Sequence, residues 1–207
     1  MKRYDVAVIG GGIAGTSAAN FLAADASVIV LEREPTLGVH STGRSAAVFT
    51  ECYGEPVVRR LAIASRDFLT DPPDGFADSP ILSPRGIVFP ATADQLGGVP
   101  ESLARQQALV PSVRGLDASE VIELCPVLDP DAVVAGVYEP EAMDLDVAVL
   151  HAGYRRSIRR NGGEIRTGAE LESAERTGES WLITIGAERV EAGVVVNAAG
   201  AWCDVVA

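Results

Sequence analysis

The first thirty residues show the hydrophobic pattern of strand, helix and strand. Residues 4–9 form a short apolar run rich in Val and Ile, which fits a parallel strand buried on both faces. Residues 13–24 then place Ala, Leu and Phe at helical spacing, and residues 27–31 form a second apolar run. We therefore predict a βαβ unit of about 30 residues at the start of the chain.

Glycines and one acid occupy special positions in this unit. Gly10 permits a tight turn off the strand, Gly12 lets a pyrophosphate approach the backbone, and Gly15 lets the helix pack closely. The phosphates would lie on free N–H groups at the positive end of the helix. Glu32 ends the second strand, where it can accept hydrogen bonds from a ribose and disfavours a 2′-phosphate, despite the adjacent Arg33. The pattern indicates a Rossmann-like dinucleotide-binding domain, and it leaves NAD and FAD both open.

The middle of the chain alternates strand and helix patterns without a second glycine motif. The predicted elements are a helix at 55–69, a strand at 86–90, helices at 100–110 and 117–124, and strands at 132–140 and 194–197. We interpret residues 86–144 as the first part of an inserted α+β substrate-binding domain. The dinucleotide-binding domain would then comprise residues 1–85 and 145–207.

Composition narrows the function classes. The 207 residues carry a formal net charge of -12, which disfavours nucleic acid and anionic lipid surfaces as partners. The three cysteines lack a CxxC motif and there are only two histidines, so we predict no metal site. Reduced thiols fit a cytoplasmic protein. No apolar run approaches the roughly 18 residues of a membrane span, so we expect no transmembrane segment.

The segment after the second strand separates the two dinucleotides. A nicotinamide-binding domain usually continues here with another helix and strand, whereas this chain has a polar loop at 38–43. We predict that Ser45 begins a short second helix and that Arg44 reaches a phosphate as a bidentate donor. A second helix N-terminus at the same pyrophosphate favours FAD. Of the two histidines, His40 should make one structural hydrogen bond, and His151 should lie on a helix surface without a role.

A resemblance to one family rests on the opening glycine motif and on four further stretches: LEREPTLGVHSTGRSAA, DLDVAVLHAGYRRSIRRNGGEI, TGAEL and VVVNAAGAWCDVVA. The chain resembles the FAD-dependent D-amino-acid oxidase (DAO) superfamily, and it looks most like the D-arginine dehydrogenase-like D-amino-acid dehydrogenases. The resemblance implies FAD as cofactor and Tyr53 on the substrate side, and it leaves Trp202 either beside the flavin or in the core. Together, motif and resemblance give these candidate cofactor-binding residues: Gly10, Gly12, Ile13, Ala14, Gly15, Glu32, Arg33, Ser41, Thr42, Arg44, Ser45, Ala46, Ala47, Leu171, Ala198, Ala199, Gly200 and Trp202.

The resemblance also implies an activity. The full-length enzyme would oxidise the C–N bond of a D-amino acid or small amine to an imine, passing a hydride to the flavin, with oxygen or a quinone as electron acceptor. A histidine and an acid of the D-arginine dehydrogenase pattern are replaced by Val48 and Ile87, so we expect an apolar or smaller substrate side chain. Two alternatives stay open: an FAD-dependent 2-hydroxy-acid dehydrogenase, and a truncated, catalytically inactive nucleotide-binding fragment. Because such enzymes run on further, we expect the isolated 207-residue chain to be inactive.

Overall fold

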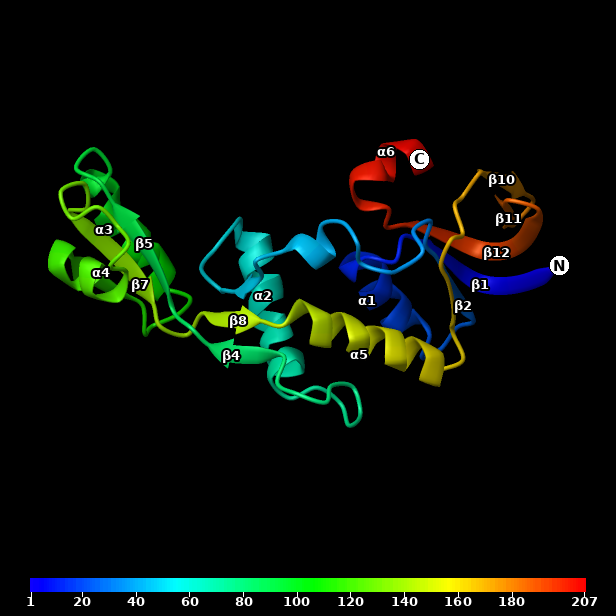
Figure 1. Ribbon diagram of the computed structural model, residues 1–207, viewed down its shortest axis with the longest axis horizontal. Coiled ribbons are helices and arrows are strands. Elements are labelled where there is room, and N and C mark those ends of the chain that lie inside the picture. The colour runs from blue at the N-terminus through cyan, green and yellow to red at the C-terminus, as the bar shows by residue number, and fades with distance from the viewer. The chain divides into compact units, whose positions relative to one another are not determined.

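The structure is a computed structural model that describes all residues from 1 to 207. The chain forms two compact units, whose elements are labelled in Figure 1. The first unit combines Met1–Ala46, Pro73–Ser79 and Val147–Ala207, and the second combines Ala47–Pro72 and Pro80–Asp146. The glycine motif therefore belongs to the first unit.

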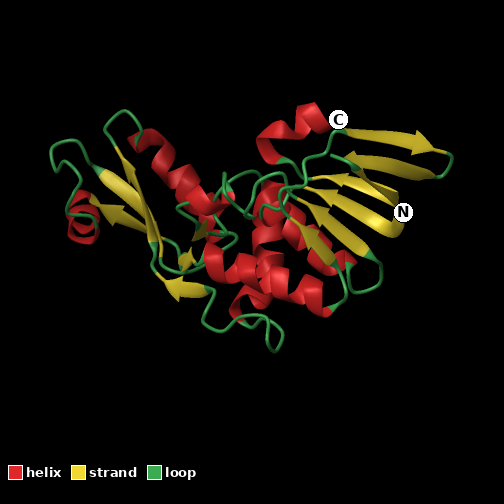
Figure 2. Cartoon of the chain, turned by 45° about the vertical axis from the view of Figure 1, so that its right-hand side comes forward, coloured by secondary structure: helices red, strands yellow, loops and turns green.

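A six-stranded sheet forms the centre of the first unit, drawn as the yellow arrows beside the N label in Figure 2. Its strands lie in the order β10 (Ser173–Thr177), β11 (Ser180–Ile185), β12 (Glu188–Asn197), β1 (Lys2–Ile9), β2 (Val28–Leu31) and β9 (Glu164–Arg166). The strands from β12 to β9 are parallel, and the β10–β11 hairpin continues the sheet in antiparallel pairing. Every residue of β2 is buried, as expected for a parallel strand covered on both faces. The predicted Rossmann-like α/β fold is confirmed.

Two helices pack on one face of this sheet. α1 (Ile13–Leu22) and α5 (Val147–Arg160) lie side by side, as Figure 1 shows. Val8 of β1 and Ile158 of α5 are fully buried in the apolar cluster between helices and sheet. The alternate residues of the strands form a second cluster on the opposite face, which includes Ile183 of the hairpin. The sheet is therefore covered on both faces, which explains its continuous apolar runs.

The short segment Pro73–Ser79 packs onto α5. Phe76 is buried, with its ring centroid 5.2 Å from that of Tyr154. Gly153 makes room for this ring, since a Cβ at that position would lie 2.4 Å from it. Arg156 donates to the carbonyl of Phe76 at 2.8 Å. An arginine near the negative end of α5 thus also anchors a neighbouring segment.

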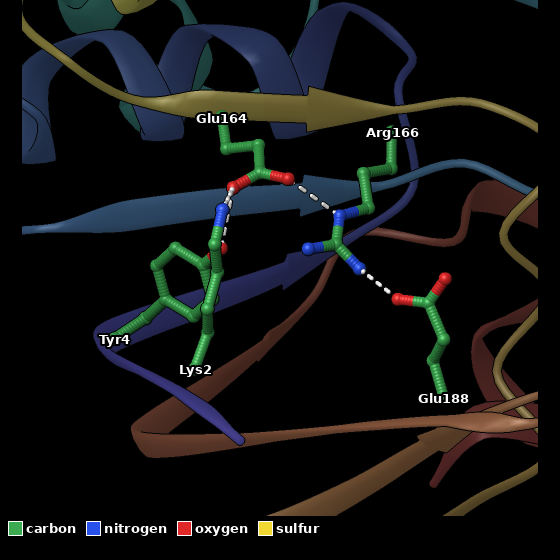
Figure 3. Close-up of polar contacts among 5 residues, drawn as sticks. All are labelled: Lys2, Tyr4, Glu164, Arg166 and Glu188. Carbon is green, nitrogen blue, oxygen red and sulfur yellow. Dashed lines mark hydrogen bonds and ion pairs between the residues drawn. The ribbon is translucent and has the colours of Figure 1, made fainter.

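A network of charged side chains joins β1, β9 and β12 near their amino ends (Figure 3). Glu164 accepts hydrogen bonds from the Tyr4 hydroxyl at 2.5 Å, from Arg166 Nε at 2.6 Å and from Lys2 Nζ at 3.0 Å. Arg166 donates a further hydrogen bond to Glu188 at 2.9 Å. The Tyr4 hydrogen bond, followed by those of Arg166 and Lys2, lowers the pKa of Glu164 to about 2. The carboxylate therefore stabilises the sheet in its ionised form.

The second unit contains two three-stranded sheets and three helices. One sheet has the order β3 (Val48–Phe49), β8 (Met143–Leu145), β4 (Leu82–Pro84), and the other has the order β5 (Ile87–Ala91), β7 (Ala135–Glu139), β6 (Arg114–Asp117). The helices are α2 (Pro56–Thr70), α3 (Val99–Gln107) and α4 (Ala118–Leu124). Asp117 caps α4 through a reciprocal pair of hydrogen bonds with Glu120, so it precedes the helix instead of forming its first residue.

The compact units divide the chain at residues other than the predicted domain boundaries. Residues 47–72 and 80–85 group with residues 86–146, whereas the prediction placed them with the first unit. The reason is strand pairing, because β3 and β4 both pair with β8 in one sheet. The assignment of a cofactor and a substrate to these parts stays a prediction.

Short helical turns complete the chain: η1 (Thr42–Arg44), η2 (Leu96–Gly98), η3 (Gly200–Trp202) and the four-residue α6 (Cys203–Val206). None of the helices is long and apolar enough to cross a membrane. No three His, Cys, Asp or Glu side chains gather into a group that could hold a metal ion.

Candidate functional site

The glycine motif lies where the parallel strands end. Gly10 follows β1 with φ +109°, a conformation that side-chain-bearing residues rarely adopt. Its N–H donates to the carbonyl of Leu31 at 2.8 Å, and a Cβ here would lie 2.4 Å from the carbonyl oxygen of Ala198. The turn therefore lies between the ends of β2 and β12, in a space that only glycine fits.

The first turn of α1 presents unpaired backbone donors beside this turn. A Cβ at Gly15 would lie 1.9 Å from a carbonyl oxygen of the glycine turn, so the helix begins as close to the strand as glycine allows. The N–H of Ile13 donates to the Thr42 hydroxyl at 2.9 Å. The N–H groups of Gly12 and Ala14 have no partner within the chain. Free donors and the helix dipole together favour an anion here.

Glu32 connects the end of β2 to the glycine turn. Its Oε2 accepts the N–H of Gly11 at 2.8 Å, and its Oε1 accepts the N–H of Glu34 at 2.9 Å. Each carboxylate oxygen has a second lone pair. The side chain can therefore hold the turn and still accept a hydrogen bond from a ligand hydroxyl.

The loop after β2 differs from the prediction at Ser45. The turn η1 ends at Arg44, and Ser45 follows it with extended backbone at ψ 131°, so no helix begins there. The chain runs through Ala46 and Ala47 directly into β3, and the carbonyl of Ala47 accepts the N–H of Leu145 at 3.1 Å. Pairing in a sheet thus takes the place of the predicted second helix. The prediction that two helix N-termini face one pyrophosphate is therefore wrong. Arg44 is exposed, and its role as a phosphate ligand stays a prediction.

Thr42 brings this loop to the first turn of α1. Its hydroxyl oxygen accepts the N–H of Ile13, and a Cβ at Gly12 would lie 3.2 Å from the same oxygen. The two ends of this loop approach each other closely, since a Cβ at Gly43 would lie 2.5 Å from the carbonyl oxygen of Gly38. Ser41 precedes η1 without a capping hydrogen bond and is exposed. Of the predicted polar loop residues, the structure thus links Thr42 directly to the glycine motif.

A cavity of about 580 Å³ opens at the same edge of the sheet. Among the residues that line it are five of the candidates predicted from separate stretches of the sequence: Gly10, Arg33, Leu171, Ala199 and Trp202. Sequence reasoning missed the wall supplied by the β10–β11 hairpin, which includes Trp181. The run of aromatic and β-branched residues at 181–185 was the available signal for that strand.

Trp202 forms one side of the cavity and is partly exposed, so it is not a core residue. The Arg33 guanidinium carbon lies 4.1 Å from the centroid of its ring, and the ring centroid of His40 lies 4.5 Å away. His40 Nε2 pairs with Glu34 Oε1 at 3.0 Å, the structural hydrogen bond predicted for this histidine. That hydrogen bond, followed by the one from Arg33, lowers the pKa of Glu34. Gly200, with φ +58°, begins the turn that carries the tryptophan.

His151 is buried, so its expected place on a helix surface is wrong. The residue is 7% exposed, and its Nε2 lies 2.9 Å from the carbonyl oxygen of Gly11. Because a carbonyl oxygen only accepts, Nε2 carries the proton. Burial, followed by the charge of Arg155, lowers the pKa of His151. The signal that was missed is its spacing on α5, three residues before Tyr154 and seven before Ile158, both of which are buried.

Tyr53 lies in the second unit and is 70% exposed. The loop that carries it is fixed by the fully buried Glu139, which accepts the Thr50 hydroxyl at 2.6 Å and the Glu51 N–H at 3.0 Å. Burial, followed by the charge of Glu139, raises the pKa of Cys52 to about 12. Glu139 therefore ties the loop to β7 and keeps the Cys52 thiol protonated, and the substrate-side role of Tyr53 stays a prediction.

The chain is similar in fold to several flavoenzymes of known structure. L-proline dehydrogenase from P. horikoshii is 20% identical with a TM-score of 0.86, over 99% of this chain and 55% of that one. Glycine oxidase from Geobacillus kaustophilus is 21% identical with a TM-score of 0.85, over 98% and 57%. L-alpha-glycerophosphate oxidase from Mycoplasma pneumoniae, solved with FAD bound, is 17% identical with a TM-score of 0.83, over 96% and 54%. The chain thus spans little more than half the length of these proteins.

One family match extends over nearly the whole sequence. Residues 5–207 match the family described as FAD dependent oxidoreductase, abbreviated DAO. The matched range includes the glycine turn, Glu32, both walls of the cavity and the η3 turn. The predicted resemblance to the DAO family is confirmed. FAD is the cofactor of this family. The chain therefore belongs to the DAO family of FAD-dependent oxidoreductases.

Proposed function

We propose that this chain is the FAD-binding part, with some of the substrate-binding part, of an enzyme that oxidises the C–N bond of a D-amino acid or small amine to an imine. The observation that carries the proposal is the pair of unpaired N–H groups, on Gly12 and Ala14, at the start of α1. They follow Gly10, which lines the 580 Å³ cavity at the carboxyl ends of the parallel strands. In open α/β sheets, ligands bind at this edge.

The residues present fit FAD. A dinucleotide needs backbone donors for its pyrophosphate, an acceptor for its ribose and a recess for its adenine. The N–H groups of Gly12 and Ala14 would hold the pyrophosphate, and Glu32 would hold the ribose of the adenosine half. Leu171 would border the adenine, and Trp202, which lines the same cavity, would lie beside the bound cofactor. A larger residue at Gly12 would crowd the donors, since a Cβ there already approaches the Thr42 hydroxyl to 3.2 Å.

When bound, the flavin of FAD supplies a hydride acceptor for the substrate carbon. The residues of this chain bind and orient the cofactor and restrict water. Arg33 and Trp202 line one side of the cavity, where the Arg33 guanidinium lies over the indole ring and His40 packs on the same ring, so the tryptophan is held in place beside the cavity. Glu32 adds a negative charge beside the ribose site, which favours FAD over a ligand that carries a 2′-phosphate.

Four observations bear on the substrate. Similarity to a glycine oxidase and to an L-proline dehydrogenase supports amine or amino-acid oxidation. Preference for a D-amino acid rests on the resemblance to D-amino-acid dehydrogenases. Val48 of β3 and Ile87 of β5 are apolar, so a substrate side chain without positive charge is favoured. Similarity to a glycerophosphate oxidase supports the second candidate, oxidation of a C–O bond in a 2-hydroxy acid.

The cofactor site is tested by the affinity for FAD. Glu32→Ala should weaken FAD binding by roughly 1–3 kcal/mol, the scale of a hydrogen bond to a charged group. Asp25→Ala, in the exposed turn that follows α1, is the matched control and should leave the affinity unchanged. Heat release followed by flavin fluorescence identifies the bound nucleotide. Release of NAD, or equal affinity in both variants, would show that the site is wrongly assigned.

The substrate class is tested with the longest natural polypeptide that contains these residues. D- and L-amino acids, sarcosine and 2-hydroxy acids are supplied in turn with a dye as electron acceptor. We expect turnover of an amine or D-amino acid with a small or apolar side chain. Turnover confined to 2-hydroxy acids would replace the proposed activity by the second candidate, and turnover confined to L-amino acids would refute the D preference.

A further inference from the structure

We propose that His151 is a positioning residue for the pyrophosphate-binding N–H groups at the start of α1. The inference rests on the proposed placement of the FAD phosphates. His151 comes from α5, about 140 residues after the glycine turn, and its Nε2–H donates to the carbonyl oxygen of Gly11 at 2.9 Å. No other side chain donates to that carbonyl.

The peptide plane explains how this hydrogen bond acts at a distance. A trans peptide is planar, and its C=O and N–H bonds point in opposite directions. When His151 holds the carbonyl of Gly11 towards α5, the N–H of Gly12 in the same peptide plane must point away from α5. The preceding peptide is also held, because Glu32 accepts the N–H of Gly11 at 2.8 Å. Both peptide units that flank Gly11 are therefore fixed.

Such restraint matters because residues 10–12 are consecutive glycines. Glycine has more backbone freedom than any other residue, and ordering it costs more entropy. A ligand that had to order three glycines itself would bind more weakly, whereas a preorganised loop avoids this cost. His151 and Glu32, from two different elements, supply the order before any ligand arrives.

The imidazole itself is held in place. The residue is 7% exposed, and Gly38 lies so close that a Cβ there would be 3.2 Å from the Cε1 atom of the ring. The ring thus lies between the glycine turn and the loop after β2. Burial, followed by the charge of Arg155, lowers its pKa and so favours the neutral imidazole. Its effect on an anion is therefore geometric, and it adds no attracting charge.

The test compares three variants with three ligands on the 207-residue chain. His151→Leu removes the donor, His151→Gln keeps a donor that can reach the carbonyl, and His151→Asn carries a donor that is too short to reach it. The ligands are FAD, ADP and adenosine, measured by flavin fluorescence and calorimetry. ADP contains the pyrophosphate without the flavin, and adenosine lacks the phosphates. Apo-protein unfolding is followed in parallel.

We expect His151→Leu to weaken FAD and ADP about tenfold, the loss of about one well-made hydrogen bond. Adenosine should bind to within about twofold of the wild type, and His151→Gln should recover most of the ADP affinity. Wild-type ADP affinity in His151→Leu would overturn the proposal. So would an equal loss for adenosine, because that result indicates a general structural role. If His151→Leu does not fold, equal ADP affinity of the Gln and Asn variants overturns it.

The same experiment separates this inference from the cofactor site. If Glu32→Ala weakens FAD while His151→Leu does not, the site stands and the role of His151 is refuted. If the wild-type chain binds neither FAD nor ADP, the proposed placement of the phosphates is refuted, and the role of His151 is refuted with it.

Discussion

Glu164→Gln should destabilise the first unit by an amount that depends on pH. The substitution keeps the shape of the side chain and removes the charge that Tyr4, Arg166 and Lys2 stabilise. A pKa of about 2, against an ordinary value of 4.5, corresponds to roughly 3 kcal/mol in favour of the ionised form. The side chain is 31% exposed, and water screens such interactions, so we expect a loss of about 2 kcal/mol at pH 7.

The sign of the pH dependence follows from the direction of the shift. The pKa of Glu164 is lower in the folded than in the unfolded chain, so its contribution is fully present above pH 4.5. As the pH falls from 4.5 towards 2, the carboxylate is protonated in the unfolded chain first, and the contribution disappears. The difference in unfolding free energy between wild type and Glu164→Gln should therefore shrink steadily through this range. Other acids titrate in both proteins and cancel in the difference.

Urea denaturation followed by tryptophan fluorescence measures this difference. Both tryptophans, Trp181 and Trp202, belong to the first unit, so the signal reports on that unit alone. Glu188→Gln is the matched control, because Glu188 accepts one hydrogen bond from Arg166 and is 73% exposed. It should change the stability by less than about 0.5 kcal/mol. A Glu164→Gln effect that is the same at pH 7 and pH 3, or no larger than that of the control, would refute the reasoning.

Three further substitutions test the close approaches in the first unit. Gly15→Ala should weaken FAD binding at least about tenfold, because its Cβ would lie 1.9 Å from a backbone oxygen and displace the N-terminus of α1. Flavin fluorescence measures the affinity. An unchanged affinity would contradict the proposed phosphate site at this helix end. Gly153→Ala gains about 1 kcal/mol of helix propensity, but it places a Cβ 2.4 Å from the buried ring of Phe76. We therefore expect the free energy of unfolding, measured in urea, to fall by about 1–2 kcal/mol. A variant that is more stable than the wild type would contradict this. Thr42→Val removes the acceptor for the N–H of Ile13 and should cost about 1 kcal/mol of stability in the same assay, whereas Thr42→Ser should cost little.

The parts of the fold that sequence reasoning predicted are set by local patterns. The apolar runs of β1 and β2 and the glycines between them define one βαβ unit, because burial of a parallel strand and the geometry of the turn need those residue types. Gly10 and Gly15 show this directly, since a Cβ at either position would collide with backbone. The candidates Leu171 and Trp202, far apart in the chain, came from the family resemblance, and the structure places both at one cavity.

The parts that were missed depend on long-range packing. Ser45 carries a good capping side chain, yet pairing of Ala47 with Leu145 keeps the backbone extended after η1. His151 gave no local signal of its role, because the acceptor lies in the glycine turn. The pairing of β8 with both β3 and β4 was not foreseen either, and the predicted domain boundary at residue 85 stays a prediction. In each case the residue or strand that decides the local structure is distant in the sequence, so no local pattern reveals the contact.

The two ends of the parallel strands are restrained in different ways, and amide hydrogen exchange should reveal it. Near the amino ends, Glu164 and Arg166 link strands through charged hydrogen bonds that are complete without any ligand. At the carboxyl ends, the N–H groups of Gly12 and Ala14 have no partner within the chain. Exchange should therefore be fast at the N–H groups of Gly12 and Ala14, and slow at Gly11 and near the charged network, since protection follows local stability. A bound dinucleotide would slow exchange at Gly12 and Ala14 only, so the hydrogen bonds that these two groups lack are supplied by the cofactor.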